Sequence, residues 1–243
     1  MHLAGSYLTS ISKGTVGSTL NTTERGQLEL CLNGDAKNYY QAAVVSLIDG
    51  LRSISVGFFS WSVVKLYYCV FYALRTRLAL AGECIFYDSG KPRYLTTSPG
   101  FTVKKLSGTT HKCVLDRFSE SFPRDFFLSQ DIEAMPPLMW LMERREDVNY
   151  RIARFTEPIS PSYLAFAANN KLRSVLSTYQ SDDVYVFDPD HAMVALPFRL
   201  MLDLRVRMQR SALNPLLNIE AEFLEGCSRD RAGVIAAISS LLR

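Results

Sequence analysis

Histidine and cysteine, the side chains that bind most zinc ions in proteins, are scarce in this sequence of 243 residues. There are three histidines and five cysteines, and no two cysteines have C-x-x-C spacing. The cysteines are widely scattered, at Cys31, Cys69, Cys84, Cys113 and Cys227. An odd number of scattered cysteines is not the pattern of a disulfide framework. We therefore expect neither a metal site nor a network of structural disulfides.

The signature motifs of several catalytic and cofactor-binding folds are also missing. The sequence has no Walker A sequence, no G-x-G-x-x-G, no H-E-x-x-H, no G-x-S-x-G and no EF-hand loop. Each of these motifs supplies a particular backbone turn or ligand set, so their absence argues against the chemistry that depends on it. We expect no cofactor.

No uninterrupted apolar run is long enough to span a membrane. The most apolar stretch, residues 56–73, is broken by Lys65, whereas a transmembrane helix needs about 20 mainly apolar residues. The N-terminal residues, MHLAGSYLTSISKG, lack a basic segment followed by an apolar one, so no secretory signal is predicted. We expect a cytoplasmic protein with no membrane contact.

The chain has the composition of a folded protein, with 48% hydrophobic and 12% aromatic residues. A chain this apolar buries enough surface to offset the entropy lost on folding, which excludes a disordered protein. Its formal net charge is only +3. Any contact with nucleic acid would therefore come from a local patch and not from a polycationic surface.

Apolar residues recur at helical spacing from residue 35 onward. Residues 1–34 show no sustained period and are predicted to form a loosely structured N-terminal arm, with a short strand or helix near residues 27–32. Asp35 is a suitable N-cap for a helix that continues to Leu51. Further helices are expected over residues 60–81, 109–122, 138–151 and 161–179, with a small β-hairpin at 84–95.

Together these segments predict a mainly all-α fold. Residues 35–180 would form an antiparallel bundle of four or five helices with the β-hairpin inserted between two of them. Residues 181–243 would be a helical C-terminal appendage, with helices over about 197–210 and 228–242. The helix at 60–81 has two apolar stripes, which indicates that it is covered on both sides.

The first candidate site is the charged run 142–151, at the end of a predicted helix. Arg145 and Asn149 are one helical turn apart. Arg144 or Arg145 would bind a phosphate, and Tyr150 would stack on a base or donate a hydrogen bond. The alternative is a solvated face whose opposite charges pair with one another, with Tyr150 packed on the bundle.

The second candidate is His111, at the start of a predicted helix. Backbone N–H groups at a helix start bind anions, and Lys104, Lys105 and Lys112 lie nearby in the sequence. The imidazole would act as a general acid or base if a substrate reached it. The alternative is a structural histidine that is hydrogen-bonded to its neighbours.

The third candidate is the basic segment 199–210. Arg199, Asp203 and Arg207 are spaced by four, which is typical of a ladder of surface ion pairs. With Arg210, the segment is also a candidate contact for nucleic acid or for an acidic partner. The sequence leaves both interpretations open.

The order of features from residue 60 to 180 resembles the HEPN superfamily of small helical bundles. The segment KLYYCVFYALR at 65–75 is similar to the family's Tyr-Tyr-x-x-Phe-x-x-x-Arg core helix. A lysine-rich stretch then leads into His111. The segment LMERREDVNY at 141–150 is similar to the Arg-x-x-x-x-Tyr ending of one HEPN branch.

The resemblance implies a function but also shows a departure from the catalytic pattern. Many HEPN proteins are metal-independent ribonucleases, with an arginine, a polar residue and then a histidine four to six residues later, assembled at a dimer interface. Here Glu146 follows Arg145, and Tyr150 stands in place of the histidine. Tyrosine has an ordinary pKa near 10, so it shuttles protons poorly at pH 7.

The resemblance therefore favours a non-catalytic accessory or assembly subunit of a prokaryotic antiviral-defence or toxin–antitoxin-type complex. It would form a homodimer or hetero-complex with a protein encoded nearby, and nucleic acid is left open as a further ligand. One alternative is a metal-independent HEPN endoribonuclease that uses Arg145, Tyr150 and His111. Another is a nucleotide-binding module that uses Lys104, Lys105 and the helix start at His111.

Overall fold

The computed structural model describes residues 2–242 and confirms the mainly helical fold with a small sheet. Met1 and Arg243, at the ends of the predicted arm and appendage, lie outside the described residues. In chain order the α-helices are α1 (Leu3–Ser10), α2 (Thr22–Ser55), α3 (Phe59–Leu80), α4 (Thr110–Ser121), α5 (Pro137–Glu146), α6 (Ser162–Asn169), α7 (Leu172–Ser181), α8 (Ala192–Arg210), α9 (Asn218–Cys227) and α10 (Ala236–Leu242). Short 3₁₀ turns lie at Phe126–Leu128 and Val184–Val186, and a π-helical turn lies at Asp147–Arg151.

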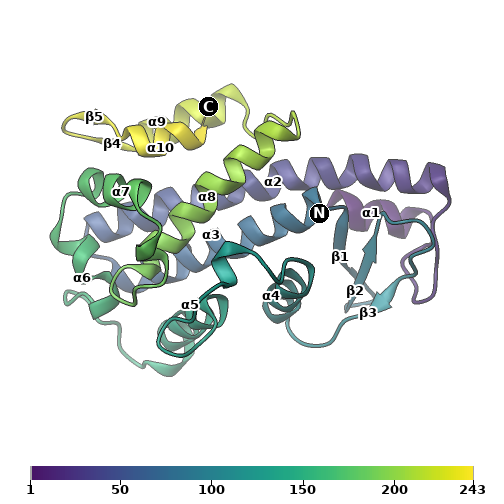
Figure 1. The fold of residues 1–243 in the computed structure, drawn as a ribbon, viewed down its shortest axis with the longest axis horizontal. Helices are drawn as coiled ribbons and strands as arrows, with labels where there is room; N and C mark the ends of the chain where they lie inside the picture. The colour runs from purple at the N-terminus through teal and green to yellow at the C-terminus, as the bar shows by residue number, and fades with distance from the viewer. Residues whose placement is uncertain (1, 243) are drawn as a thin grey trace.

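The long helices α2 and α3 form the centre of the molecule. They run antiparallel along its long axis because only residues 56–58 connect them (Figure 1). Helix α8 crosses α3 on one side, and α4 and α5 pack on the other. Sixteen of the 22 residues of α3 are buried. This confirms the prediction, from its two apolar stripes, that the helix is covered on more than one face.

The prediction of a loose N-terminal arm over residues 1–34 is wrong. Helix α2 begins at Thr22, where Asn21 and Glu24 form a reciprocal capping box. Its first turns pack through Leu28 and Leu32 in a second apolar cluster with α1 and the sheet. The capping signal is present in the sequence, but the exposed Leu30 between these two leucines gives an alternating pattern that conceals the helical period.

Asp35 caps a helix, but not the predicted one. It lies inside α2, is 2% exposed, and accepts hydrogen bonds from the backbone N–H groups of Leu3 and Ala4 at 2.8 and 3.0 Å. No side chain of α1 caps that helix's own N-terminus. The Asp35 carboxylate therefore supplies the missing acceptors and fixes α1 against α2.

The inserted hairpin is confirmed. Strands β1 (Glu83–Asp88) and β2 (Lys91–Thr96) pair antiparallel, with Cys84 opposite Leu95. Ser89 and Gly90 both have positive φ in the two-residue turn, which matches the right-handed twist of the strands. A two-residue strand β3 (Lys104–Lys105) adds to β2, so the insertion is a three-stranded sheet.

The predicted helix at 161–179 is divided in two. Helix α6 ends at Asn169 and α7 starts at Leu172, because Asn170 and Lys171 have extended backbone. One apolar stripe runs through both segments, so the sequence period did not reveal the break.

The C-terminal region differs from the expectation of an appendage. Helix α8 begins at Ala192, earlier than expected, and its buried residues belong to the same core as α2 and α3. Helix α9 was not predicted. The expected helix at 228–242 is instead a small hairpin of β4 (Arg229–Asp230) and β5 (Gly233–Val234) followed by α10.

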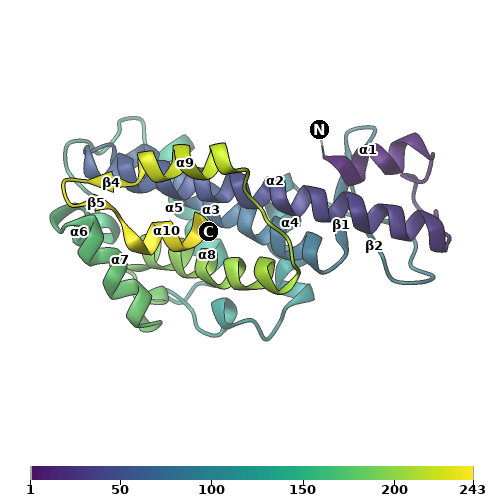
Figure 2. The ribbon, with the colours of Figure 1, turned by 90° about the horizontal axis from the view of Figure 1, so that it is seen from above.

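Helices α9 and α10 lie side by side over α2 and α8 (Figure 2). The buried hydroxyl of Tyr40, in α2, donates a hydrogen bond of 2.8 Å to the backbone carbonyl of Leu241. The end of the described chain is thus attached to the middle of its longest helix. Among residues 2–242, no helix is both long and apolar enough to cross a bilayer.

We expect Asp35→Ala to lower the free energy of unfolding by about 1–3 kcal/mol, because two buried N–H groups lose their acceptor. Hydrogen exchange should also become faster at the amides of α1. Chemical denaturation and hydrogen-exchange mass spectrometry measure the two effects. Asp49→Ala is the matched control on the same helix, since its ion pair with Lys65 is partly exposed and contributes at most about 1 kcal/mol. Equal losses in the two variants would contradict the capping role.

Candidate functional site

Three helices bring a cation, an imidazole and three phenol rings together on the α4–α5 side of α3. We call this the Arg145 site. Its members are Tyr67 and Tyr68 from α3, His111 from α4, Arg145 from α5 and Tyr150 from the π-helical turn. The site forms because α4 and α5 both pack on α3.

Arg145 is the centre of the site and is only 8% exposed. Its guanidinium carbon lies 5.6, 5.8 and 5.4 Å from the ring centroids of Tyr67, Tyr68 and Tyr150. One guanidinium nitrogen is 3.4 Å from the Tyr68 hydroxyl, and Nε has no hydrogen-bond partner among the described residues. The guanidinium forms no ion pair with any residue that the structure describes. Cation–π contacts therefore replace a carboxylate, and hydrogen-bond donors remain unused.

The π-helical turn places Tyr150 beside Arg145. Tyr150 is five positions after Arg145, and in a regular α-helix the two side chains would point about 140° apart. The backbone N–H of Ile152 bonds to the carbonyl of Asp147 at 3.0 Å, five residues earlier, which widens the turn. Tyr150 is 74% exposed, although its ring lies close to the guanidinium. Its ring therefore covers one side of Arg145 while most of its own surface contacts solvent. Such π turns occur frequently at functional sites.

His111 supplies the imidazole that is missing from the Arg145–Tyr150 segment. Its Nδ1 is 3.0 Å from the Tyr67 hydroxyl, and its ring packs 4.6 Å from that of Phe71. Burial lowers the pKa of His111, Arg145 lowers it further, and Glu146 partly opposes them. The imidazole is therefore neutral at pH 7. Burial likewise raises the pKa of Tyr67, so its hydroxyl stays protonated.

The arrangement has two chemical capacities. A guanidinium with unused donors binds a phosphate or a carboxylate once Tyr150 moves aside. If Nδ1–H of His111 donates to the Tyr67 oxygen, Nε2 is left with a lone pair to accept a proton. The structure thus brings together Arg145, Tyr150 and His111, the three residues predicted as catalytic candidates.

The other candidates of the 142–151 run have structural contacts. Arg144 pairs with Glu133 at 2.6 Å and stacks on the Trp140 ring. Asn149 is half-buried in the π-helical turn and forms no side-chain hydrogen bond with Arg145 among the described residues. Arg144 therefore forms the kind of ion pair that the alternative interpretation predicted, whereas Arg145 does not.

The lysines near His111 in sequence are not gathered around its ring. Lys112 pairs with Asp116 at 2.8 Å on the exposed side of α4. Lys104 and Lys105 are exposed on β3, and Lys104 lies over the Phe101 ring at 4.7 Å. The anion site predicted at this helix start therefore lacks the cluster of cations that the sequence suggested.

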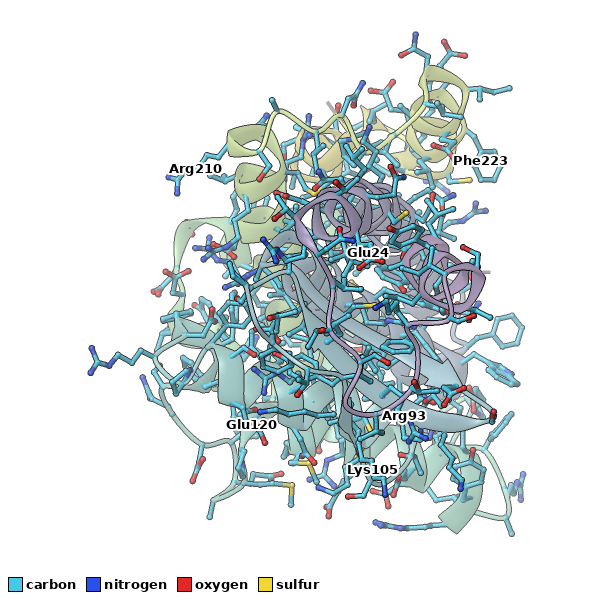
Figure 3. All side chains as sticks on the ribbon, turned by 90° about the vertical axis from the view of Figure 1, so that its right-hand side faces the viewer. Glu24, Arg93, Lys105, Glu120, Arg210 and Phe223 are labelled. Carbon is cyan, nitrogen blue, oxygen red and sulfur yellow. The ribbon has the colours of Figure 1, made fainter. Side chains whose placement is uncertain are left out.

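The basic segment 199–210 contains ion pairs. Arg207 pairs with Asp203 at 2.6 Å, which confirms one step of the predicted ladder. Arg199 instead pairs with Asp183 and donates to the Gln180 carbonyl at 2.9 Å. Arg210 projects from the end of α8 (Figure 3). Asp203 also contacts the buried Arg77 at 3.1 Å, so the segment helps to fix α8 to α3.

Sequence reasoning did not include Tyr67 and Tyr68 in the site. They were noted as members of two apolar stripes and of the segment that resembles the HEPN core helix, but they were given no role in a site. The signal that could have found them is their chemistry, because two adjacent tyrosines on a buried helix both need hydrogen-bond partners.

Metal binding has no support in the described part of the chain, where no group of three or more His, Cys, Asp or Glu residues is placed to hold an ion. Comparisons with protein-family models, with curated proteins and with solved structures find no match. Function is therefore inferred from the geometry of the Arg145 site and from the resemblance in sequence.

We expect the pKa of His111 to respond in opposite directions to its two charged neighbours. Arg145→Gln removes a cation that disfavours imidazolium, so the pKa should rise. Glu146→Gln removes an anion that favours it, so the pKa should fall. An NMR titration of the imidazole Cε1–H measures both shifts, and His111→Gln assigns the signal among the three histidines. Shifts in the same direction would contradict the described geometry.

Proposed function

We propose that the protein is a HEPN-like accessory subunit of a prokaryotic antiviral-defence or toxin–antitoxin-type complex that binds single-stranded RNA at the Arg145 site. The observation that carries this proposal is the buried guanidinium with unused donors under an exposed tyrosine ring. Arginine binds phosphate through two parallel hydrogen bonds. Exposed aromatic rings stack on the unpaired bases of single-stranded RNA. Arg145 and Tyr150 supply these two interactions next to each other.

An apolar surface supports assembly with a protein partner. Val56, Phe58 and Trp61 are exposed around the start of α3, and Phe155 packs edge-on against Trp61 at 5.8 Å. The Glu157 carboxylate accepts hydrogen bonds from the backbone N–H and the hydroxyl of Ser60, which holds this loop against the helix. Clustered exposed apolar side chains are typical of interaction surfaces. They suit a homodimer or a hetero-complex.

We expect Tyr150→Ala to weaken binding of single-stranded RNA by about five- to a hundredfold, since stacking of one base contributes about 1–3 kcal/mol. Fluorescence anisotropy with a labelled unstructured oligonucleotide measures the affinity. Phe223→Ala is the matched control, because this exposed ring lies on α9, on the opposite side of the molecule from α5 (Figure 1). The proposal is wrong if the wild-type protein does not bind RNA, or if both variants lose affinity equally.

The second candidate function is metal-independent cleavage of RNA, favoured by the imidazole of His111, which contacts the same two tyrosine rings as Arg145. His111 Nε2 would accept the proton of a ribose 2′-hydroxyl as its oxygen attacks the adjacent phosphorus. Arg145 would stabilise the negative charge that develops on the phosphoryl oxygens. The 5′-oxygen would leave and take a proton from water. The products are a 2′,3′-cyclic phosphate and a 5′-hydroxyl.

This candidate predicts RNA cleavage that persists in EDTA and that His111→Gln abolishes. The rate should fall at low pH as the imidazole becomes protonated. Because the pKa of His111 is lowered from its ordinary value of 6.5, activity should persist below that pH. Gel analysis of a labelled RNA across pH measures the rates. If the wild-type protein binds RNA without cutting it, only the accessory function remains. If the His111→Gln variant still cuts RNA, the activity belongs to another group.

A further inference from the structure

A groove lies between the second half of α2 and the C-terminal region. These elements lie on the side of the molecule opposite α5 (Figure 1). Figure 2 shows α9 and α10 beside α2. Its volume is about 800 Å³, and its walls come from α2, the α6–α7 junction, α9, the β4–β5 turn and α10. We call it the C-terminal groove. It shares none of its lining residues with the Arg145 site.

The floor of the C-terminal groove is apolar. Ile48 and Leu51 from α2 and Ile235 and Ile238 from the C-terminal segment form its base, each at most 4% exposed. The more accessible apolar side chains of Val56 and Leu172 also line the groove. Pockets for small organic ligands have volumes of about 300–1,000 Å³ and mainly apolar walls. The size and floor of the groove fit such a ligand.

The rim is strongly cationic. Five basic side chains and one acidic side chain line the groove, a local charge of +4 in a chain whose net charge is +3. Arg173 neutralises the acid, Asp230, at 2.9 Å and also donates to the carbonyls of Gly233 and Val234. The remaining four cations have no ion pair or hydrogen bond through their side chains within residues 2–242. They are Arg52, Lys171, Arg229 and Arg231.

We propose that the C-terminal groove binds a free long-chain carboxylate, with its hydrocarbon chain against the accessible apolar lining and its carboxylate among the unpaired cations. A small anion would leave the accessible apolar lining at Val56 and Leu172 in water, and an uncharged lipid would leave the cations unpaired. An amphiphilic anion satisfies both, because burial of the chain and pairing of the head group favour binding together. This ligand site is independent of RNA binding at Arg145.

The test is isothermal titration of the full-length protein with dodecanoate, kept below its micelle-forming concentration. Dodecyltrimethylammonium, which has the same chain and the opposite charge, is titrated in parallel. We expect saturable binding of one dodecanoate per protein and at least tenfold weaker binding of the cation. Equal binding of the two amphiphiles would show nonspecific adsorption to apolar surface and would overturn the proposal, as would no binding of dodecanoate.

Two variants locate the ligand. Arg52→Gln/Arg231→Gln should weaken dodecanoate binding by about five- to tenfold, since each exposed cation contributes at most about 1 kcal/mol. Arg154→Gln/Arg210→Gln removes two exposed charges elsewhere and should leave the affinity unchanged. Equal effects of the two pairs would place the ligand outside the groove.

The groove is also open to a steric test. Gly226 lines it on α9, and a Cβ added there meets no atom within 4 Å. Gly226→Leu should therefore fill the groove without disturbing the core and reduce binding at least tenfold, with the melting temperature as a check on folding. Unchanged affinity in the folded variant would overturn the proposal.

Cys227 provides a readout without substitution, because its half-buried thiol lines the groove. Dodecanoate should slow alkylation of Cys227 at least fivefold. It should not affect Cys31, which is also half-buried but lies near the start of α2. Peptide mass spectrometry measures both rates. Equal protection of the two thiols, or protection of neither, would contradict the assignment.

Discussion

The burial of α3 on nearly every side is the constraint on which the rest of the structure depends. A helix with only six of its 22 residues accessible needs partners all round. Helices α2, α4, α5 and α8 provide them. Its polar side chains must then find their partners inside the molecule. Thr76 bonds to a carbonyl of its own helix, Ser62 bonds to the Gly50 carbonyl, and Arg77 pairs with Asp125 and Asp203. The Arg145 site is another consequence, because two tyrosines of α3 meet the guanidinium and the imidazole of helices that cover it.

The sequence was most informative where one period and clear end signals coincide. Helix α3 and the β1–β2 hairpin were predicted to within about two residues, since apolar stripes and a Ser-Gly turn are local features. The prediction failed at α1 and the start of α2. There the helices are stabilised by Asp35 and by burial of Leu28 and Leu32 against the sheet, which are contacts between segments distant in sequence. Secondary-structure propensity is weak evidence when tertiary contacts decide the outcome.

For the candidate site, the sequence identified the residues but not their arrangement. Arg145, Tyr150 and His111 were all singled out, and one alternative joined them in a single site, but no feature of the sequence showed that they meet. His111 stands far from Arg145 in the sequence, and only the packing of α4 and α5 on α3 brings the two together. The π-helical turn was equally hidden, because helical periodicity does not reveal a single wide turn. Spacing alone could not show that Arg145 and Tyr150 share a face.

The hydrogen bond from Tyr40 to the carbonyl of Leu241 has a consequence for how the chain completes its structure. The Tyr40 hydroxyl, in the middle of α2, has its acceptor on Leu241, which is 201 positions further along the chain. When the C-terminal segment is not packed on α2, the hydroxyl has no acceptor in the apolar interior, which costs free energy. Shortening the chain by a few residues at this end would therefore be felt deep in the bundle. A deletion or fusion near Leu241 would therefore change the buried surroundings of Tyr40 in α2.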